Sequence, residues 1–289
     1  MKKFLNFLRE LLSVVLICIG LALVFYPTAM TFSYQWKAEQ YVHNYEKKHR
    51  KQINKEDDPM YHEIVRYNKR IYQNGQKDFK DAWIAKQTPI SLPIDKKFGY
   101  IQIKSIDVKL PLYIGATDRN LSKGAAILGG TSIPVGMMNC NSAIAAHRGY
   151  SGIPFFRNIE GVKIGDKVVI RNPWEKITYV VTSIDIIHPN DIERVKIQPG
   201  KDMITLITCH PYRSHGKFRY LVFCERKGTE SLGKDYTKGK NQKEEFLSSE
   251  PDIKRENIAR LIALGFSILL ILKKLLDLFR WIQERKKKE

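Results

Sequence analysis

Paired cysteines are absent from this sequence. Its 289 residues include 4 cysteines, and none of them forms a C-x-x-C pair or stands at a histidine-flanked zinc spacing. A disulfide framework, a zinc cage and a dithiol redox site are therefore not indicated. Any cysteine that takes part in chemistry must act singly.

Acidic residues are also scarce relative to basic ones. The 30 Asp and Glu are outnumbered by 49 Lys and Arg, which gives a formal charge of +19. This balance suits nucleic acid, an anionic membrane surface or an anionic cell wall, and charge alone does not choose among them. A hydrophobic content of 43% excludes wholesale disorder and suits one substantial folded domain with appendages.

The first of two long apolar runs lies near the N-terminus. Residues 11–32 contain no charge, and Lys2, Lys3 and Arg9 precede them. About 20 apolar residues suffice to cross a bilayer as a helix, and positive flanks favour the cytoplasmic side. We expect an uncleaved anchor within residues 1–34. A cleaved signal peptide is the alternative, but the run is long and no A-x-A site follows it.

The second apolar run spans Ile258 to Leu272 and is interrupted only by Arg260 near its edge. Seven Lys and Arg against three Asp and Glu follow it, as expected of a cytoplasmic tail. We expect a second crossing within residues 257–289, with both termini in the cytoplasm and the middle outside, away from nucleic acid. An amphipathic helix on the membrane surface is the alternative, because residues 275–282 remain partly apolar.

Two helices are predicted after the first apolar run. Apolar residues recur at helical spacing from Tyr34 to Tyr45, and Asp58 with Pro59 has the pattern of an N-cap and first helical position. The pair Asn74-Gly75 ends the second helix. Residues 76–88 then show neither a helical nor a strand period, which predicts a loop.

Short β-type runs begin at Phe98 and are separated by Gly, Pro, Asn and Asp. They predict a β-barrel or sandwich. The polar residues 230–256 read as a tether to the second apolar run. The seven runs are Tyr100–Ile103, Val108–Ile114, Ser142–Ala146, Lys167–Ile170, Ile177–Ile187, Met203–Thr208 and Phe218–Phe223.

Three candidate catalytic residues stand in or at the ends of these runs. Cys209 ends one run, His147 ends another just before Arg148-Gly149, and Arg219 lies in the last. A pair of strands joined by a loop would return Arg219 to Cys209. An imidazole can assist a thiol and protonate a leaving amine, and a guanidinium can stabilise an oxyanion. Taken singly, each is more commonly an inert cysteine, a structural histidine or a solvated cation.

The combination resembles the sortase family of cysteine transpeptidases. Thr205-Leu206-Ile207-Thr208-Cys209, Arg219 and His147-Arg148-Gly149 carry the resemblance, and Thr208–Tyr212 with Gly124–Gly136 further resemble the class C, pilin-polymerising branch. The resemblance covers about Phe98 to Arg226. It implies a closed β-barrel in which Cys209 is the nucleophile, His147 the general acid and base, and Arg219 the oxyanion stabiliser.

Class C sortases also have a lid loop with an Asp-Pro-aromatic motif over the active site. Asp81-Ala82-Trp83 resembles that motif, with Ala82 in place of Pro. The resemblance implies that Asp81 pairs with Arg219 and that Trp83 covers Cys209. Asp58-Pro59-Met60 is a competing match, but it is better explained as a helix start. Cys140 and Cys224 receive no role.

The implied protein is mainly β with α: an anchor (1–34), extracellular helices and lid (35–92), a catalytic barrel (93–229), a linker (230–256) and a C-terminal transmembrane helix with a basic tail (257–289). On the surface of a Gram-positive bacterium, it would cleave a Leu-Pro-x-Thr-Gly-like signal and join pilins through a lysine isopeptide bond. No metal or organic cofactor is implied. The alternatives are a sortase that anchors proteins to peptidoglycan and a non-catalytic wall-binding protein.

Overall fold

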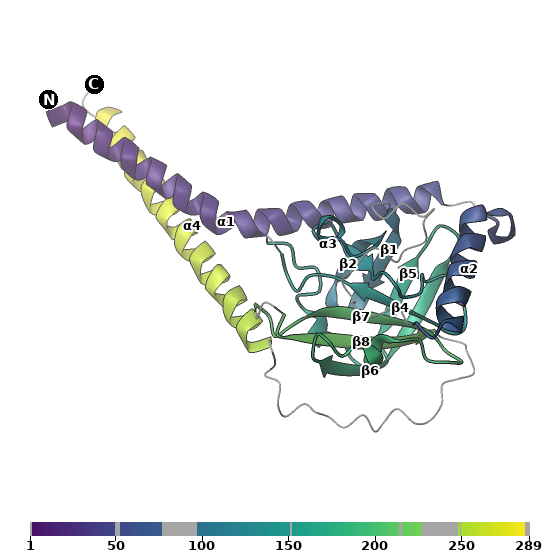
Figure 1. Ribbon diagram of the computed structural model, residues 1–289. Helices are drawn as coiled ribbons and strands as arrows, with labels where there is room; N and C mark the ends of the chain where they lie inside the picture. The colour runs from purple at the N-terminus through teal and green to yellow at the C-terminus, as the bar shows by residue number, and fades with distance from the viewer. Residues whose placement is uncertain are drawn as a thin grey trace. The chain divides into compact units, whose positions relative to one another are not determined.

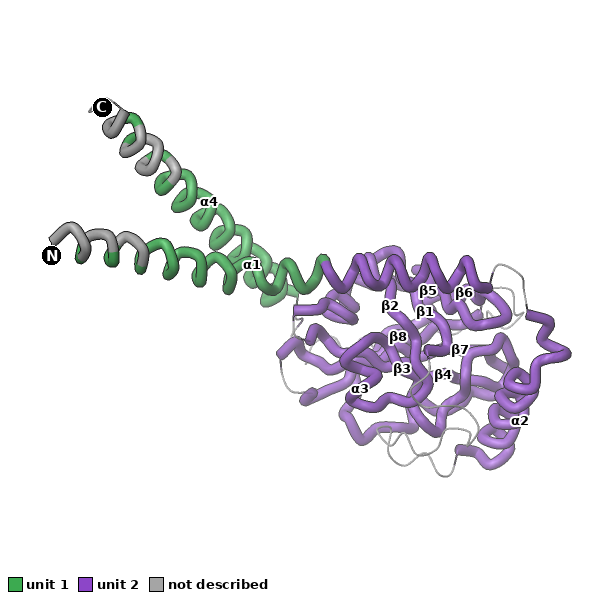
Figure 2. Tube along the Cα trace, turned by 90° about the horizontal axis from the view of Figure 1, so that it is seen from above, with its two compact units in different colours: residues 1–32, 250–289 green, residues 33–249 purple. Residues whose placement is uncertain are grey.

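The computed structural model describes residues 2–49, 53–76, 97–150, 152–213, 216–226, 248 and 250–286. The chain divides into two compact units, coloured separately in Figure 2. Unit 1 combines Met1–Phe32 with Glu250–Glu289, and unit 2 is Ser33–Ser249. We describe each unit by itself.

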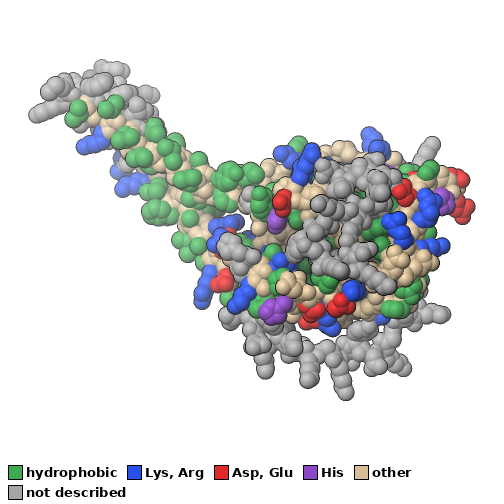
Figure 3. Space-filling view, in the orientation of Figure 1, with side chains coloured by type: hydrophobic (Ala, Val, Ile, Leu, Met, Phe, Trp, Pro, Cys, Tyr) green, Lys and Arg blue, Asp and Glu red, His purple; other side chains and the backbone are tan. Residues whose placement is uncertain are grey.

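Unit 1 consists of the first part of α1 (Lys2–Lys48) and of α4 (Glu250–Lys286). Large apolar side chains are exposed along both helices, as the green surface in Figure 3 shows. In the described part of the chain, α1 is the one helix long and apolar enough to cross a membrane, over Leu12–Lys48. The second crossing expected at Ile258–Leu272 is not supported in the same way.

Unit 2 is a closed barrel of eight strands in the order β1-β2-β3-β4-β7-β8-β6-β5, with β5 pairing back to β1 (Figure 1). Neighbouring strands are antiparallel except β2–β3 and β4–β7, which are parallel. Closure confirms the barrel and excludes the sandwich. The strands are β1 (Lys97–Ile103), β2 (Val108–Ile114), β3 (Ala125–Ile127), β4 (Cys140–Ala145), β5 (Lys167–Arg171), β6 (Lys176–Ile187), β7 (Asp202–His210) and β8 (Phe218–Arg226).

Among the strands of the described residues, β3 is the one that the sequence did not predict. It has three residues and pairs in parallel with β2 and antiparallel with β4. A segment this short cannot display a period of two, and glycines flank it at Gly124 and Gly129. The pairing that closes this side of the barrel is therefore visible only in three dimensions.

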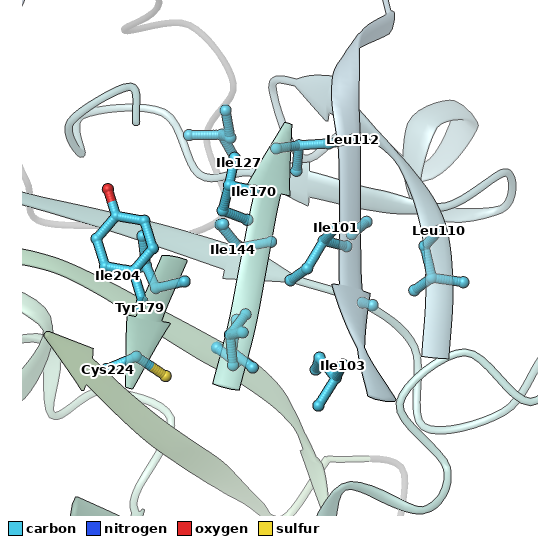
Figure 4. Packing of buried hydrophobic residues seen from close by; sticks show 14 of the residues in the cluster. Ile101, Ile103, Leu110, Leu112, Ile127, Ile144, Ile170, Tyr179, Ile204 and Cys224 are labelled. Atoms are coloured by element: carbon cyan, nitrogen blue, oxygen red, sulfur yellow. The ribbon is translucent and has the colours of Figure 1, made fainter. Parts of the chain in front are cut away.

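The core lies inside the barrel. Successive side chains of a strand point to opposite faces, so Ile101 and Ile103 of β1 share the inner face. Both are fully buried among side chains of the other strands, and Figure 4 shows this packing. The labelled members also include Leu110, Leu112, Ile127, Ile144, Ile170, Tyr179, Ile204 and Cys224.

Helix α1 runs without a break from Lys2 to Lys48, so the expected anchor and the expected first helix are parts of one helix. Its C-terminal part is fixed to β1. The hydroxyl of Tyr41 donates to the carbonyl of Gly99 at 3.1 Å, and that of Tyr45 to the carbonyl of Phe98 at 2.9 Å.

Helix α2 (Pro59–Gln73) packs on the barrel through its N-cap and its buried face. The carboxylate of Asp58 accepts from the backbone of Met60 and from the indole of Trp174, both at 2.9 Å. The prediction that Asp58 begins this helix is confirmed. The remaining short helices are η1 (Lys55–Asp57), η3 (Lys104–Ile106), α3 (Asp118–Leu121), η4 (Ile159–Gly161) and η5 (Ile192–Val195).

Candidate active site

The antiparallel pairing of β7 with β8 places Cys209 directly opposite Arg219. The register runs from Met203 opposite Glu225 to His210 opposite Phe218. Directly opposed residues on an antiparallel pair have neighbouring side chains. The pair of strands that the sequence predicted therefore exists, and it brings the two residues together.

His147 reaches the same end of the barrel through β4. This strand pairs in parallel with β7, with Ala145 level with Ile207. Beyond that pair, the backbone N–H of Ala146 donates to the carbonyl of Ile207 at 3.2 Å, and the hydroxyl of Thr208 donates to the carbonyl of Ala146 at 2.8 Å. Continuing the register by two residues brings His147 level with Cys209.

Cys209 is the half-buried thiol of the barrel, whereas Cys140 and Cys224 are buried. Burial raises the pKa of the Cys140 thiol to about 12 and that of Cys224 well above its ordinary value. Because the thiolate is the reactive form, these two thiols are poor nucleophiles. Cys209 is thus the thiol of the barrel that a substrate can reach.

The guanidinium of Arg219 is held against the loop between β7 and β8. Its Nη1 donates to the carbonyl of Gly216 at 2.6 Å and to that of Phe218 at 3.0 Å. Burial lowers the pKa of Arg219, while the charge of a Cys209 thiolate acts in the opposite direction. The guanidinium and the sulfur are therefore close enough to influence each other electrostatically.

Gly216 leaves room for both groups. A Cβ at this position would lie 3.2 Å from the sulfur of Cys209 and 2.7 Å from Nη1 of Arg219. Its φ of +82° is also in the left-handed region that favours glycine. Any side chain here would displace the guanidinium or cover the sulfur.

The imidazole of His147 contacts two aromatic rings. Tyr150 stacks on it with centroids 4.8 Å apart and planes 15° apart, and Phe155 meets it edge-on at 6.3 Å. Burial lowers the pKa of His147, and the charge of Asp118 on α3 opposes this only in part. The neutral imidazole is favoured, which is the form that accepts a proton.

A buried network that the sequence analysis did not identify adjoins Cys209. The guanidinium of Arg148 donates from Nη1 to the carbonyl of Cys209 at 3.4 Å and to Nδ1 of His210 at 2.9 Å, and from Nη2 to Glu160. The sequence motifs include Arg148 and His210, but no role was predicted for either residue. Glu160 lies in η4, outside any motif or periodic segment.

Within the described ranges, no three His, Cys, Asp or Glu side chains gather in a way that could hold a metal ion. The arrangement instead offers a reachable thiol, an imidazole and a guanidinium at one rim of the barrel. These are the groups needed for nucleophilic attack on a carbonyl, proton transfer and oxyanion stabilisation.

A model of the sortase domain matches residues 101–227. Sortase A of Bacillus anthracis is 31% identical over 166 residues, which is 55% of this chain and 77% of that protein. The chain belongs to the sortase family. Sortases are cysteine transpeptidases, so this chain is an enzyme of that kind.

Solved structures place this sortase beside sortase C proteins. A Clostridium perfringens sortase C, solved with the C-terminal cell wall sorting motif, is 33% identical with a TM-score of 0.55 and covers 65% of this chain and 97% of its own. Sortase C1 of GBS pilus island 1 is 28% identical with a TM-score of 0.58 and covers 65% and 91%. The predicted resemblance to class C sortases is confirmed.

The lid prediction cannot be compared with this geometry. Asp81 and Trp83 lie in residues 77–96, outside the described part of the sortase. The catalytic prediction concerns described residues: Cys209 and Arg219 face each other, and the β4–β7 register brings His147 to the same rim.

Proposed function

We propose that this sortase polymerises pilins: it cleaves a Leu-Pro-x-Thr-Gly-like signal between Thr and Gly and joins the Thr to a lysine of another pilin. The observation that carries the proposal is the half-buried Cys209 opposite Arg219, on the rim that β4 reaches at His147. The similarity to a sortase C from a pilus island favours pilins as substrates.

In the first step, the Cys209 thiol gives its proton to neutral His147, and its sulfur attacks the carbonyl carbon of Thr while the carbonyl electron pair moves onto oxygen. Arg219 stabilises this oxyanion by donating hydrogen bonds to it. The tetrahedral intermediate collapses as His147 gives a proton to the departing Gly nitrogen. The products are a Cys209 thioester and a free glycine amine.

In the second step, a lysine amine of the acceptor pilin attacks the thioester carbonyl. His147, now neutral, takes the proton that the amine loses, and the sulfur leaves as a thiolate. The isopeptide bond replaces the thioester, and His147 returns the proton to the thiolate, so both proton and charge balance over the cycle. The burial that favours neutral His147 suits this second step in particular.

We further propose that α1 anchors the sortase in the cell membrane with the barrel outside, which confines it near substrates that are held in the same membrane. Confinement raises the effective concentration of a short signal. The second crossing by α4 belongs to the same proposal. Its support is the exposed apolar stretch, including Leu261, Leu269 and Leu272, followed by the basic C-terminal residues.

Anchoring of surface proteins to peptidoglycan is the second candidate, because the sequence relative from Bacillus anthracis is named sortase A. The full chain in detergent micelles, incubated with a Leu-Pro-x-Thr-Gly peptide and a purified pilin, separates the two candidates. A Cys209 adduct with lysine-linked ladders supports polymerisation. An adduct without ladders supports anchoring, and the absence of an adduct contradicts both.

A further inference from the structure

The backbone pairing of β4 with β7 brings His147 level with Cys209, but the pairing ends before it reaches these two residues. Between β4 and β7, the last backbone hydrogen bond is from Ala146 to Ile207 at 3.2 Å. The carbonyl of His147 is used elsewhere, by the N–H of Phe156 at 3.0 Å. In the described structure, therefore, no ladder bond joins His147 to the strand that carries Cys209.

The side chain of Arg148 spans this gap. Its backbone follows His147 directly, and its Nη1 reaches the carbonyl of Cys209 at 3.4 Å and Nδ1 of His210 at 2.9 Å. A guanidinium only donates, so Nδ1 of His210 accepts and the ring proton lies on Nε2. Arg148 thus ties the segment that carries His147 to the end of β7.

Glu160 fixes the orientation of Arg148. One carboxylate oxygen accepts from Nη2 of Arg148, and the other accepts from the hydroxyl of Ser248 at 2.6 Å. The side chains are 2% exposed for Arg148, 9% for Glu160 and 1% for His210. The ring of Tyr220 lies 5.5 Å from the guanidinium and covers it.

Glu160 is ionised in this setting. Burial raises its pKa, but the charge and hydrogen bond of Arg148, together with the hydrogen bond from Ser248, outweigh burial and hold the pKa well below its ordinary value. Charged pairs inside a protein are expensive to desolvate, and apolar side chains of similar volume often stabilise a fold as well or better. Stability of the barrel is thus a weak explanation for this pair.

We propose that Arg148, Glu160 and His210 form a clamp that positions His147 relative to Cys209. The clamp residues are positioning residues, since they act through the backbone on either side of the predicted catalytic groups. This inference rests on the roles proposed above for Cys209 and His147. Ser248 extends the clamp to the chain segment that leads into α4.

Glu160→Gln tests the clamp, because it removes the charge and keeps the size. The matched control is Glu225→Gln. The side chain of Glu225 is 5% exposed and pairs with Lys201 at 2.8 Å, at the end of the β7–β8 pair that lies away from Cys209. Both variants are made in the full chain in detergent micelles. Displacement of reacting groups by about 1 Å can cost about a hundredfold in rate, so Glu160→Gln should lower kcat tenfold to a hundredfold with little change in KM.

Hydrogen exchange supplies a second readout that does not depend on catalysis. Glu160→Gln should speed exchange at the backbone amides of residues 147–149 and 209–210, and Glu225→Gln should not. Arg148→Met should lower kcat, and Arg148→Lys should recover less than half of that loss. Lysine keeps the positive charge but cannot donate to three acceptors in one plane.

Equal losses of kcat in Glu160→Gln and Glu225→Gln would overturn the clamp, because general destabilisation would then explain both. Unchanged exchange at residues 147–149 and 209–210 would also overturn it. If the unmodified sortase forms no Cys209 adduct, the proposed function fails and with it the catalytic purpose of the clamp. The exchange data would then show whether the contact itself holds the two segments.

Discussion

At each end of the β7–β8 strand pair, a carboxylate with little exposure to solvent lies close to an arginine, and the pKa values of the two carboxylates shift in opposite directions. Near Cys209, the pKa of Glu160 is lowered. At the far end, burial raises the pKa of Asp202 to about 6 despite the opposing charge of Arg226. The difference follows from the partners and their geometry.

Arg148 is itself buried and donates directly to Glu160. Arg226 is 3.5 Å from Asp202 and makes its shorter hydrogen bond, at 2.7 Å, to the carbonyl of Gly136. Tyr179, the other partner of Asp202, is neutral and donates from 3.1 Å. The comparison shows that burial dominates at the Asp202 end, where the carboxylate is harder to ionise, whereas the partners of Glu160 stabilise an ionised carboxylate near Cys209.

The largest expected effect is on transpeptidation, and it distinguishes Cys209 from Cys140. Cys209→Ala should abolish the thioester and lower transpeptidation by about four orders of magnitude or more, as loss of a nucleophile does. Cys140→Ala, at the Asp202 end, should retain activity because its thiol is buried. Mass spectrometry of the enzyme with a Leu-Pro-x-Thr-Gly peptide checks both. Normal transpeptidation by Cys209→Ala would end the proposed mechanism.

The next largest expected effect is on kcat, and it distinguishes Arg219 from Arg226. Removal of one oxyanion donor typically costs about 10²–10³ in kcat, so Arg219→Ala should lose about that much. Arg226→Ala should leave kcat nearly unchanged and lower stability instead, because it removes a charge that favours ionised Asp202. Steady-state kinetics and thermal melts of both variants decide the matter. A loss of kcat as large in Arg226→Ala would remove the distinction between the ends.

A smaller effect tests the lid that the sequence predicts over Cys209. If Trp83 covers the sulfur, Trp83→Ala should raise the rate of alkylation by iodoacetamide several-fold, since an indole excludes water and reagents from a thiol. Peptide mapping should show Cys209 labelled and Cys140 and Cys224 unlabelled until the protein unfolds. Unchanged labelling of Cys209 in Trp83→Ala would contradict the lid.

The smallest effect concerns stability at the Asp202 end. Because the folded pKa is raised to about 6, the folded state binds the proton more tightly than the unfolded chain. The stabilising contribution is full below the ordinary carboxyl pKa and is lost as pH rises through about 6. Asp202→Asn should therefore show a Tm that falls a few degrees less than that of the parent between pH 4 and pH 7.

The contribution of Glu160 to stability depends on pH in the opposite direction. Its lowered pKa means a contribution present at neutral pH and lost as pH falls below the ordinary carboxyl pKa. Glu160→Gln should thus flatten the acid side of the Tm profile, and Asp202→Asn the side between pH 4 and pH 7. Identical profiles for the two variants would show that the two carboxylates do not differ.

The sequence could predict the part of the site that depends on strand pattern. Cys209 and Arg219 lie on adjacent periodic segments joined by a short loop, so local pattern and chain continuity suffice to pair them. His147 ends a third such segment, and the resemblance to sortases placed it with the other two. The strands follow from the same alternation, apart from β3, whose three residues are too few to show it, whereas the choice of a closed barrel over a sandwich came from the resemblance.

The clamp could not be predicted in this way. Glu160 occupies a single 3-10 turn without periodicity, and its partners are Arg148, 12 residues before it, and Ser248, 88 residues after it. Such contacts depend on how loops close over the barrel rather than on any pattern along the chain. The continuity of α1 was also missed, because the sequence was divided where its apolar character ends.

That continuity bears on how this sortase can be released from a cell. Tyr41 and Tyr45 of α1 are bonded to β1, so the helix whose apolar part is the proposed membrane anchor also forms part of the surface of the catalytic unit. Cleavage by a protease within residues 33–48 would interrupt a helix that is hydrogen-bonded to the barrel, rather than cut a linker that makes no contact with it. Shedding in this way would yield a damaged domain, and secreted active enzyme would require a cut closer to the N-terminus.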